Sequence, residues 1–313
     1  MRTGRAESWG IILAGGEGTR LRPLTRLVSG DDRPKQFCPM LRGETPLAVT
    51  RRRTALQVPP ERTLVVVTRA HERFYVPLVA DVPVGGLAVQ PGSRGTAAAI
   101  LYGLLRVEAL SATAPVAIVP SDHWVSDDAA FMAHVAAAFE VVLRRPDLIV
   151  LLGIAPDHPE VEYGWIEPAD PIPVEAPTPV YRVRGFWEKP PLAVARTLLA
   201  GGCLWNSFLI VARVPALLAL IRSALPDVYG AFARVRGRLG GAGEPDAVVG
   251  VYTGLRAANF SREVLASRPG NLAVLPVSGL EWSDWGDARR VLATLARLGI
   301  SPKWAEPSRT ALA

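Results

Sequence analysis

Short apolar runs alternate with longer stretches of helical periodicity in the first half of the chain. The apolar runs lie at residues 9–15, 63–68, 86–91, 115–122 and 148–154. They are rich in valine, isoleucine and leucine, which favours strands covered on both faces. Segments 95–110 and 129–145 repeat apolar residues at helical spacing. This alternation predicts an α/β fold, with a Rossmann-like, mixed and mostly parallel sheet flanked by helices.

The pattern changes between residues 163 and 189, where prolines interrupt extended pieces. Such a segment predicts a small antiparallel elaboration inserted in the parallel order. We interpret it as part of the same domain, because no linker separates it from the preceding runs. The expected boundaries are a single domain over residues 7–300, with a first part at about 7–155, a second part at about 156–300 and a tail at 301–313.

Composition limits the class of protein. The 313 residues are 49% hydrophobic and 20% charged, which is enough for one sizeable core. The longest apolar stretches are too short for a membrane span or are broken by Arg213 and Pro215. The N-terminus has no long apolar run of the kind found in signal peptides, and Cys38 and Cys203 have no metal or redox spacing. We therefore expect a cytoplasmic protein with reduced thiols and no membrane partner.

The net charge of +6 raises the question of a polyanionic partner. The basic residues are scattered, and the densest cluster, residues 51–53, follows Pro46 on an expected helix, where it would form a solvated face. A positive cleft would also attract a small phosphorylated substrate. Charge alone leaves both interpretations open, but the scattered distribution predicts no nucleic-acid partner.

A glycine-rich loop follows the first apolar run, in the stretch “IILAGGEGTRLRPLT” at residues 11–25. Glycines let backbone N–H groups approach a ligand closely, and such a loop before a helix forms an anion site. The spacing is neither the dinucleotide fingerprint nor a Walker loop, and Arg20 and Arg22 supply charged forks for phosphate oxygens. A tight strand-to-helix turn without a ligand is the alternative. Lys35, after a proline, adds a point charge shortly downstream.

The loop and the following “RPKQF” together resemble the sugar-1-phosphate nucleotidylyltransferases, also called nucleoside diphosphate sugar pyrophosphorylases. The forms “PKQF”, “PSDH” and “RGTAAAI” are most similar to the mannose-1-phosphate guanylyltransferases. The resemblance extends from Trp9 to about Leu298 through further segments in the family order, namely “QPGSRGTAAAI”, “VPSDHW”, “EYGWIEP”, “GFWEKP”, “LWNSFLIV” and “EWSDWGD”.

The resemblance implies attack by a sugar 1-phosphate oxygen on the α-phosphorus of a nucleoside triphosphate. Arg20 would bind the triphosphate and Lys35 the α-phosphate, while Asp122 and Asp284 would hold Mg²⁺. These four are the expected catalytic residues. Taken alone, Asp122 could instead cap the helix that begins near Ser126, and Asp284 could be a turn residue.

The resemblance also implies a nucleotide-binding part at about 7–155 and a sugar-phosphate-binding part at about 156–300. In the second part, Gly164 and Glu188 would meet sugar hydroxyls, Lys189 the sugar phosphate and Asn206 a hydroxyl. In the first part, Gln90 and the backbone of Gly95 and Thr96 would meet the base. The full set of expected nucleotide contacts is Leu13, Ala14, Gly15, Gly16, Gly18, Thr19, Arg20, Lys35, Gln90, Gly95 and Thr96.

The function implied is transfer of GMP from GTP to mannose 1-phosphate, giving GDP-mannose and pyrophosphate. Gly95 stands where guanylyltransferases usually have asparagine, so a thymidylyl- or uridylyltransferase acting on glucose 1-phosphate is an alternative. A catalytically silent nucleotide-sugar sensor on the same fold is another. The chain ends soon after the catalytic segments, so no isomerase activity is expected, and homo-oligomerisation is left open.

Overall fold

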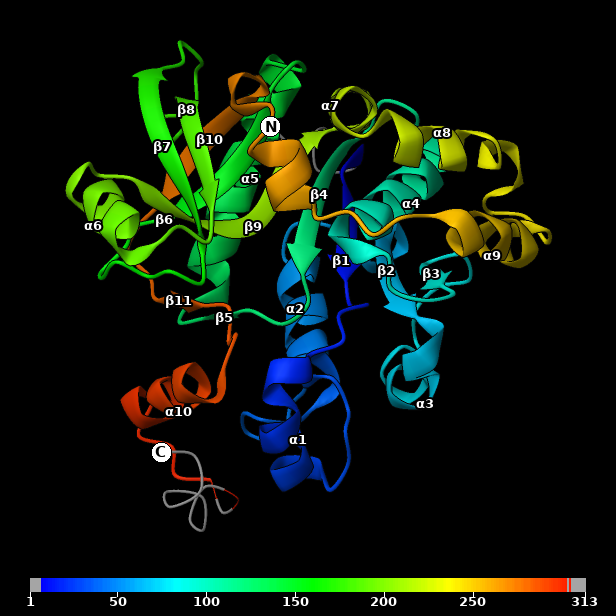
Figure 1. Ribbon diagram of the computed structural model, residues 1–313, viewed down its shortest axis with the longest axis horizontal. Helices are drawn as coiled ribbons and strands as arrows, with labels where there is room; N and C mark the ends of the chain where they lie inside the picture. Colours follow the sequence, from blue (N-terminus) through cyan, green and yellow to red (C-terminus); the bar gives the residue numbers. More distant parts are fainter. Residues whose placement is uncertain (1–6, 303, 305–313) are drawn as a thin grey trace.

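A computed structural model describes residues 7–302 and residue 304 of the chain, and its centre is one nine-stranded sheet (Figure 1). The strand order is β3-β2-β1-β4-β9-β6-β10-β8-β7. Their bounds are β1 (Trp9–Leu13), β2 (Thr63–Thr68), β3 (Leu87–Gln90), β4 (Pro115–Pro120), β6 (Ile149–Ile154), β7 (Gly164–Pro171), β8 (Tyr181–Glu188), β9 (Leu204–Arg213) and β10 (Leu272–Val277).

The predicted fold class is confirmed. All five apolar runs are strands of this sheet, with ends within two residues of the expected ones, and the helix expected at 95–110 is α4 (Gly95–Leu110). Strands β1 to β4 pair in parallel, as do β6 and β10. The expected antiparallel elaboration is the hairpin of β7 and β8 at one edge.

Strand β9 lies antiparallel between β4 and β6, in the middle of the sheet, and this placement was not predicted. It joins the strands of residues 7–155 to those of residues 156–300 in one continuous sheet. Its inner residues are as apolar as those of a parallel strand because helices cover both faces. An apolar run therefore does not reveal the direction in which its strand runs.

Helices cover both faces of the sheet, so alternate strand residues belong to two different cores. Ile11 packs with α4, α7 (Val214–Ala224), α8 (Pro226–Ala233) and α9 (Glu244–Gly254), whereas Ile12 packs with α2 (Pro46–Ala55) and α5 (Asp128–Arg144). Two further helices are α3 (Glu72–Tyr75) and α6 (Leu192–Ala200), and a two-stranded ribbon pairs β5 (Trp124–Val125) with β11 (Trp282–Ser283).

A third, smaller core joins segments far apart in the sequence. Leu24 of α1 (Arg22–Ser29) packs in it with Trp285 and with Leu295 of α10 (Ala288–Arg297). Figure 1 shows α1 and α10 at the same end of the molecule, beyond the ribbon of β5 and β11. This core brings the segment after the glycine loop next to the segment that contains Asp284.

The expectation of a solvated arginine cluster at residues 51–53 is wrong for Arg53. Its side chain is buried, with Nε 2.5 Å from Oδ1 of Asp128 at the start of α5. Arg51 and Arg52 form exposed pairs with Asp81 and Glu44. Arg53 thus contributes to the packing of α2 against α5.

In the described ranges, no helix is long and apolar enough to cross a membrane.

Candidate active site

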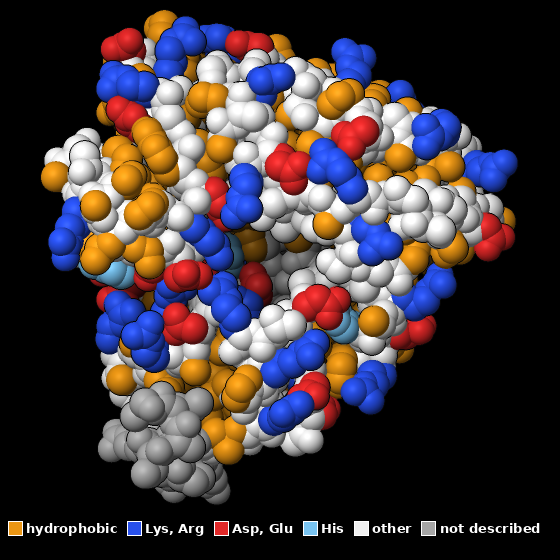
Figure 2. All heavy atoms as spheres, in the orientation of Figure 1, with side chains coloured by type: hydrophobic (Ala, Val, Ile, Leu, Met, Phe, Trp, Pro, Cys, Tyr) orange, Lys and Arg blue, Asp and Glu red, His pale blue; other side chains and the backbone are white. Residues whose placement is uncertain are grey.

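Two adjoining cavities lie at the carboxyl ends of β1 and β4, where ligands bind in open α/β sheets. They share three lining residues, Thr96, His123 and Phe208. Figure 2 shows a hollow near the middle of this face, with acidic and basic side chains around its rim. We call the first, about 260 Å³, the nucleotide-side cavity and the second, about 300 Å³, the sugar-side cavity.

Most of the predicted site residues line these two cavities. The nucleotide-side cavity is lined by Leu13, Gly15, Gly16, Gln90, Gly95, Thr96 and Asp122, and the sugar-side cavity by Arg20, Thr96, Gly164, Glu188, Lys189, Asn206 and Asp284. Ala14, Gly18, Thr19 and Lys35 are not among the lining residues. Arg20, expected on the triphosphate, thus faces the sugar-side cavity, near the junction of the two.

The glycine loop is held in place by contacts that explain its glycines. A Cβ on Gly15 would lie 2.5 Å from Nε2 of Gln90, and Gly18 has a φ of 59°. Nε2 of Gln36 donates to the carbonyl oxygens of Ala14 (3.0 Å) and Gly16 (2.8 Å). The loop therefore has one fixed shape, a requirement for binding phosphates through backbone N–H groups.

Gly95, the departure from the guanylyltransferase pattern, is required by its surroundings. Its φ is 82°, and a Cβ there would lie 2.3 Å from the carbonyl oxygen of Ala258. In the same segment, the backbone N–H of Phe260 donates a hydrogen bond to Oγ1 of Thr96 at 2.9 Å. An asparagine could not occupy this position without moving the segment around Ala258. The glycine is thus accounted for by packing, whatever base the cavity takes.

Gln90 is buried beneath the nucleotide-side cavity. Its Oε1 accepts a hydrogen bond from the hydroxyl of Tyr252 at 2.9 Å, and its Nε2 lies 3.5 Å from the carbonyl oxygen of Val67. Of the two polar atoms of its amide group, Oε1 is therefore already paired with a side chain of α9. Base recognition through Gln90 rests on Nε2, whose bond to Val67 is long.

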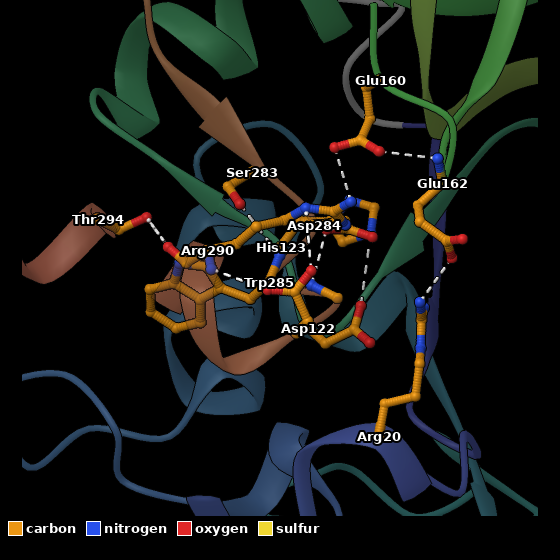
Figure 3. Close-up of polar contacts among 12 residues, drawn as sticks. Arg20, Asp122, His123, Glu160, Glu162, Ser283, Asp284, Trp285, Arg290 and Thr294 are labelled. Carbon is orange, nitrogen blue, oxygen red and sulfur yellow. Dashed lines mark hydrogen bonds and ion pairs between the residues drawn. The ribbon is translucent and has the colours of Figure 1, made fainter. Parts of the chain in front are cut away.

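Lys35 lies between the two expected metal ligands. Its ammonium donates to the carbonyl oxygens of Asp284 (2.5 Å) and Trp285 (3.0 Å) and is 3.2 Å from Oδ2 of Asp122 (Figure 3). Only 8% of Lys35 is exposed. Sequence reasoning did not find these contacts, because the partners are about 250 residues apart. The lysine thus ties the segment after α1 to the loop after β11.

Asp284 is held ionised by its neighbours. Burial alone would raise its pKa, but the cations of Lys35 and Arg290 and the N–H of Gly286 outweigh burial, and the pKa of Asp284 is lowered. Oδ1 accepts from Gly286 N at 2.7 Å and from Nη1 of Arg290 at 2.9 Å. Asp284 therefore makes a turn contact, as the alternative interpretation expects, and still presents a carboxylate to the sugar-side cavity.

Arg290, on α10, is a site residue that sequence reasoning missed. Its guanidinium contacts Asp284, lies 2.8 Å from Glu160 and sits 4.4 Å from the ring centroid of Tyr163 (Figure 3). It is the second of two adjacent arginines that follow the “SDWGD” segment closely. That proximity to acidic residues is a weak signal, and only the fold shows which carboxylates it meets.

Asp122 does not cap a helix. The N-cap of α5 is Asp127, whose side chain accepts from Ala130 N, so Asp122 lines the nucleotide-side cavity with its carboxylate beside Lys35. His123 packs against Trp282, and burial lowers its pKa. A neutral histidine next to Asp122 adds no charge to the site at neutral pH.

The sugar-side cavity gathers its four predicted residues from three strands. A Cβ on Gly164 of β7 would lie 3.1 Å from Oε2 of Glu188 and 3.3 Å from Cβ of Asn206, so glycine lets the two side chains approach the β7 backbone closely. Burial raises the pKa of Glu188, and the neighbouring Lys189 opposes that rise. Lys189 has a φ of 53°, a region that lysine rarely adopts, and its N–H donates to Tyr163 O at 3.1 Å.

Glu162, which sequence reasoning did not single out, bridges the two sides of the site. Its Oε2 is 2.8 Å from Nη1 of Arg20 (Figure 3) and 3.3 Å from Nζ of Lys189. Both cations are those expected to bind phosphates. The only sequence signal was its place as the first residue of the “EYGWIEP” segment.

A further cavity of about 610 Å³ lies on the other side of Tyr163 and Trp282, which line both it and the sugar-side cavity. None of the predicted site residues lines it. Two of its arginines, Arg290 and Arg297, are paired with carboxylates. Its volume therefore does not make it the better candidate for two phosphorylated substrates.

The donor set at the junction of the two cavities fits Mg²⁺. Two carboxylates, Asp122 and Asp284, face adjoining cavities, and Asp284 is held ionised. Mg²⁺ prefers hard oxygen ligands and is often bound by one or two carboxylates together with substrate phosphates and water. Among the described residues no group of three or more His, Cys, Asp and Glu side chains is arranged to hold a metal, so a closed structural site is not present there.

Comparison with known proteins agrees with this geometry. The sequence profile of the nucleotidyl transferase family matches residues 9–225, which contain the glycine loop, Lys35, Asp122, Lys189 and Asn206. The chain belongs to the nucleotidyl transferase family. This assignment agrees with the resemblance noted in the sequence.

Three known proteins show how far the similarity extends. Two of them were compared by sequence and the third by structure. The xanthan biosynthesis protein XanB of Xanthomonas campestris pv. campestris is 33% identical over 224 residues, 71% of this chain and 45% of its own. A mannose-1-phosphate guanylyltransferase of Sinorhizobium fredii is 30% identical over 288 residues, 88% of this chain and 52% of its own. The chain thus spans about half the length of these curated relatives.

The third is a solved structure, a protein of Thermus thermophilus described as a mannose-1-phosphate geranyltransferase, which superposes with a TM-score of 0.77. It is 32% identical, and the match covers 92% of this chain and 79% of that one. The nucleotidyltransferase fold therefore extends over nearly the whole chain, beyond the residues that the family profile matches.

Proposed function

We propose that this nucleotidyltransferase transfers GMP from GTP to mannose 1-phosphate, giving GDP-mannose and pyrophosphate. The observation that carries the proposal is a pair of adjoining cavities, one lined by Asp122 and the other by Asp284, with Lys35 in contact with both residues. One has a rigid glycine loop of the kind that binds phosphates, and the other has Glu188, Lys189 and Asn206 for a phosphorylated sugar. Relatives named mannose-1-phosphate guanylyltransferase support the choice of substrates.

In this reaction an oxygen of the sugar phosphate attacks the α-phosphorus of GTP. A new P–O bond forms on one side as the bond to the β-phosphate oxygen breaks on the other, and pyrophosphate leaves. No covalent enzyme intermediate is required, so catalysis rests on positioning and on charge neutralisation. Mg²⁺ held by Asp122 and Asp284 would neutralise phosphate charge and hold the reacting groups in line.

The chain's own residues supply the remaining functions. Backbone N–H groups of the glycine loop, held by Gln36, bind the triphosphate. Arg20 neutralises charge on the departing pyrophosphate. Lys35, bound to two carbonyl oxygens and beside Asp122, fixes the separation of the two metal-binding loops and adds positive charge near the α-phosphate. Lys189 binds the phosphate of the sugar substrate in the sugar-side cavity.

The experiment that tests the proposal is pyrophosphate release with Mg²⁺, using GTP, ATP, UTP, CTP and dTTP each against mannose 1-phosphate and glucose 1-phosphate. Reactions with excess EDTA are the control. The proposal predicts that GTP with mannose 1-phosphate gives the highest kcat/KM. Preference for dTTP or UTP with glucose 1-phosphate would keep the reaction and reassign the base and sugar, whereas binding without turnover of any pair would identify a sensor.

A further inference from the structure

Strand β9 contains a bulge where it passes between the two cavities. Leu151 of β6 pairs with Ile210 and Gly153 with Asn206, so three residues of β9 lie opposite Leu152 alone. The polar groups of the bulge are satisfied locally. Oγ of Ser207 donates to Leu152 O at 2.7 Å, and Oδ1 of Asn206 accepts from Phe208 N at 3.0 Å. Bulges of this kind redirect a side chain and are common beside active sites.

The side chain that this bulge redirects is Phe208. Its φ of 58° lies in the left-handed region, where a bulky residue is a marked outlier. Among the described residues only four non-glycine residues have positive φ. Three of the four lie at the site, namely Lys189, Phe208 and Trp285. Strained backbone that persists in a folded protein concentrates at functional positions.

Phe208 also lies at the border between the nucleotide-side and the sugar-side cavity. It lines both cavities, and an edge-to-face contact with Phe260, at 6.3 Å between ring centroids, fixes its ring. Apart from Phe208, Tyr163 and Trp282, the sugar-side cavity is lined by polar, charged or glycine residues, including Glu188 and Asn206. An aromatic ring here offers no hydrogen bond to a sugar hydroxyl, and it takes up volume at the junction.

We propose that Phe208 determines specificity by limiting the size of the sugar. The aromatic ring admits hexose 1-phosphates whose C2, C3 and C4 carry only hydroxyl groups and excludes those with a bulkier substituent such as an acetamido group. This inference rests on the proposed function. The bulge holds the Phe208 backbone amide on Asn206, and the ring packs edge-to-face on Phe260, which keeps it at the border of the two cavities. Glycine, which adopts positive φ without strain, would fold the same bulge without the ring.

The test replaces Phe208 by glycine and, separately, by alanine. Initial rates are measured with GTP and either mannose 1-phosphate or N-acetylglucosamine 1-phosphate, and calorimetry gives the Kd of each sugar phosphate. The expected result is a rise of tenfold or more in the kcat/KM and affinity of the acetamido sugar relative to the unsubstituted one. Arg42→Gly is the control, because Arg42 has a φ of 50° but lies exposed in a turn outside both cavities.

The outcomes separate this inference from the proposed function. Turnover of mannose 1-phosphate with an unchanged ratio in both Phe208 variants would overturn the role of Phe208 and leave the function intact. Absence of turnover in the wild type and in both Phe208 variants, with tighter calorimetric binding of the acetamido sugar phosphate by the variants, would overturn the function. The size limit set by Phe208 would then still stand. A relaxed ratio in Arg42→Gly as well would assign the effect to strain relief and overturn the inference.

Discussion

Oε2 of Glu162 lies 2.8 Å from Nη1 of Arg20. The arginine expected to bind the triphosphate therefore already forms an ion pair with a carboxylate of the protein. The same oxygen is 3.3 Å from Nζ of Lys189, which is expected to bind the sugar phosphate. The two cations are thus joined through one internal anion. Both substrates must displace or share this anion when their phosphates bind.

Glu162→Gln is therefore expected to lower the KM values for both GTP and mannose 1-phosphate. The ion pairs are half-exposed, and such pairs contribute about 0.2–1 kcal/mol, so each KM should fall by no more than about fivefold. Steady-state kinetics with each substrate varied in turn would measure this. Glu167→Gln, which removes a pair with Arg184 outside the cavities, is the matched control. A rise in either KM would mean that Glu162 contacts that substrate directly.

Asp122→Asn and Asp284→Asn are each expected to reduce kcat by at least about 100-fold, since a metal ion supplies several kcal/mol of charge stabilisation in such reactions. The Mg²⁺ concentration for half-maximal rate should rise in both variants. Pyrophosphate release over a Mg²⁺ titration measures both effects, and circular dichroism confirms folding. Asp170→Asn, an exposed residue at the end of β7, serves as control. Near-normal rates in both site variants would rule out their role as metal ligands.

Lys189→Ala should act on one substrate. A hydrogen bond to a charged group contributes about 1.5–3 kcal/mol, so the KM for the sugar phosphate should rise by about 10- to 150-fold. The KM for GTP should change little, because Glu162 remains on Arg20. Arg184→Ala on the neighbouring strand β8 gives the background effect of losing a surface cation. Equal increases for both substrates would contradict the assigned role.

Arg290→Gln is expected to destabilise the protein at neutral pH and much less in acid. Burial tends to raise the pKa of both carboxyls, but the N–H of Glu162 and Arg290 lower the pKa of Glu160, and Lys35 and Arg290 lower that of Asp284. A carboxylate with a lowered folded-state pKa stabilises the protein above its unfolded-state pKa, about 4, and loses this contribution as pH falls through the folded value. These pairs are partly buried, so the loss should lie between about 1 kcal/mol for an exposed pair and about 3–5 kcal/mol for a fully buried one.

Urea unfolding of the wild type and of Arg290→Gln from pH 7 to pH 3 measures this. The difference in free energy of unfolding should shrink as the pH falls below about 4, where the carboxylates become protonated. Arg297→Gln, on the same helix but half-exposed and paired with Glu281, should show a small difference at every pH. A difference that does not change with pH would mean that Arg290 acts through packing on Tyr163 alone.

The apolar pattern predicted the strands well because the sheet is covered on both faces. All six residues of β2 are buried, for example, and the run that predicted it has the same bounds. The direction of β9 could not be predicted, since a central strand reads as an apolar run in either direction. The bulge at Phe208 also left no sequence signal, because it depends on the register with β6.

The site was predicted through motifs, and its internal contacts were not. The motif segments brought Gly164, Glu188 and Asn206 together correctly in one cavity. The contacts of Lys35 with the carbonyl oxygens of Asp284 and Trp285 connect opposite ends of the motif order, and no local spacing encodes them. Residue roles that depend on charge partners across such distances require the folded structure.

The link between Lys35 and Asp284 also sets when the candidate site can form during synthesis of the chain. The two residues are 249 positions apart, and the small core around Leu24 and Trp285 that brings them together needs α10 as well. At translation rates of roughly 5–20 residues per second, Lys35 leaves the ribosome roughly 12–50 s before its partner. The glycine loop is thus synthesised early, but a nascent chain cannot assemble the charge network around Lys35 until α10 emerges.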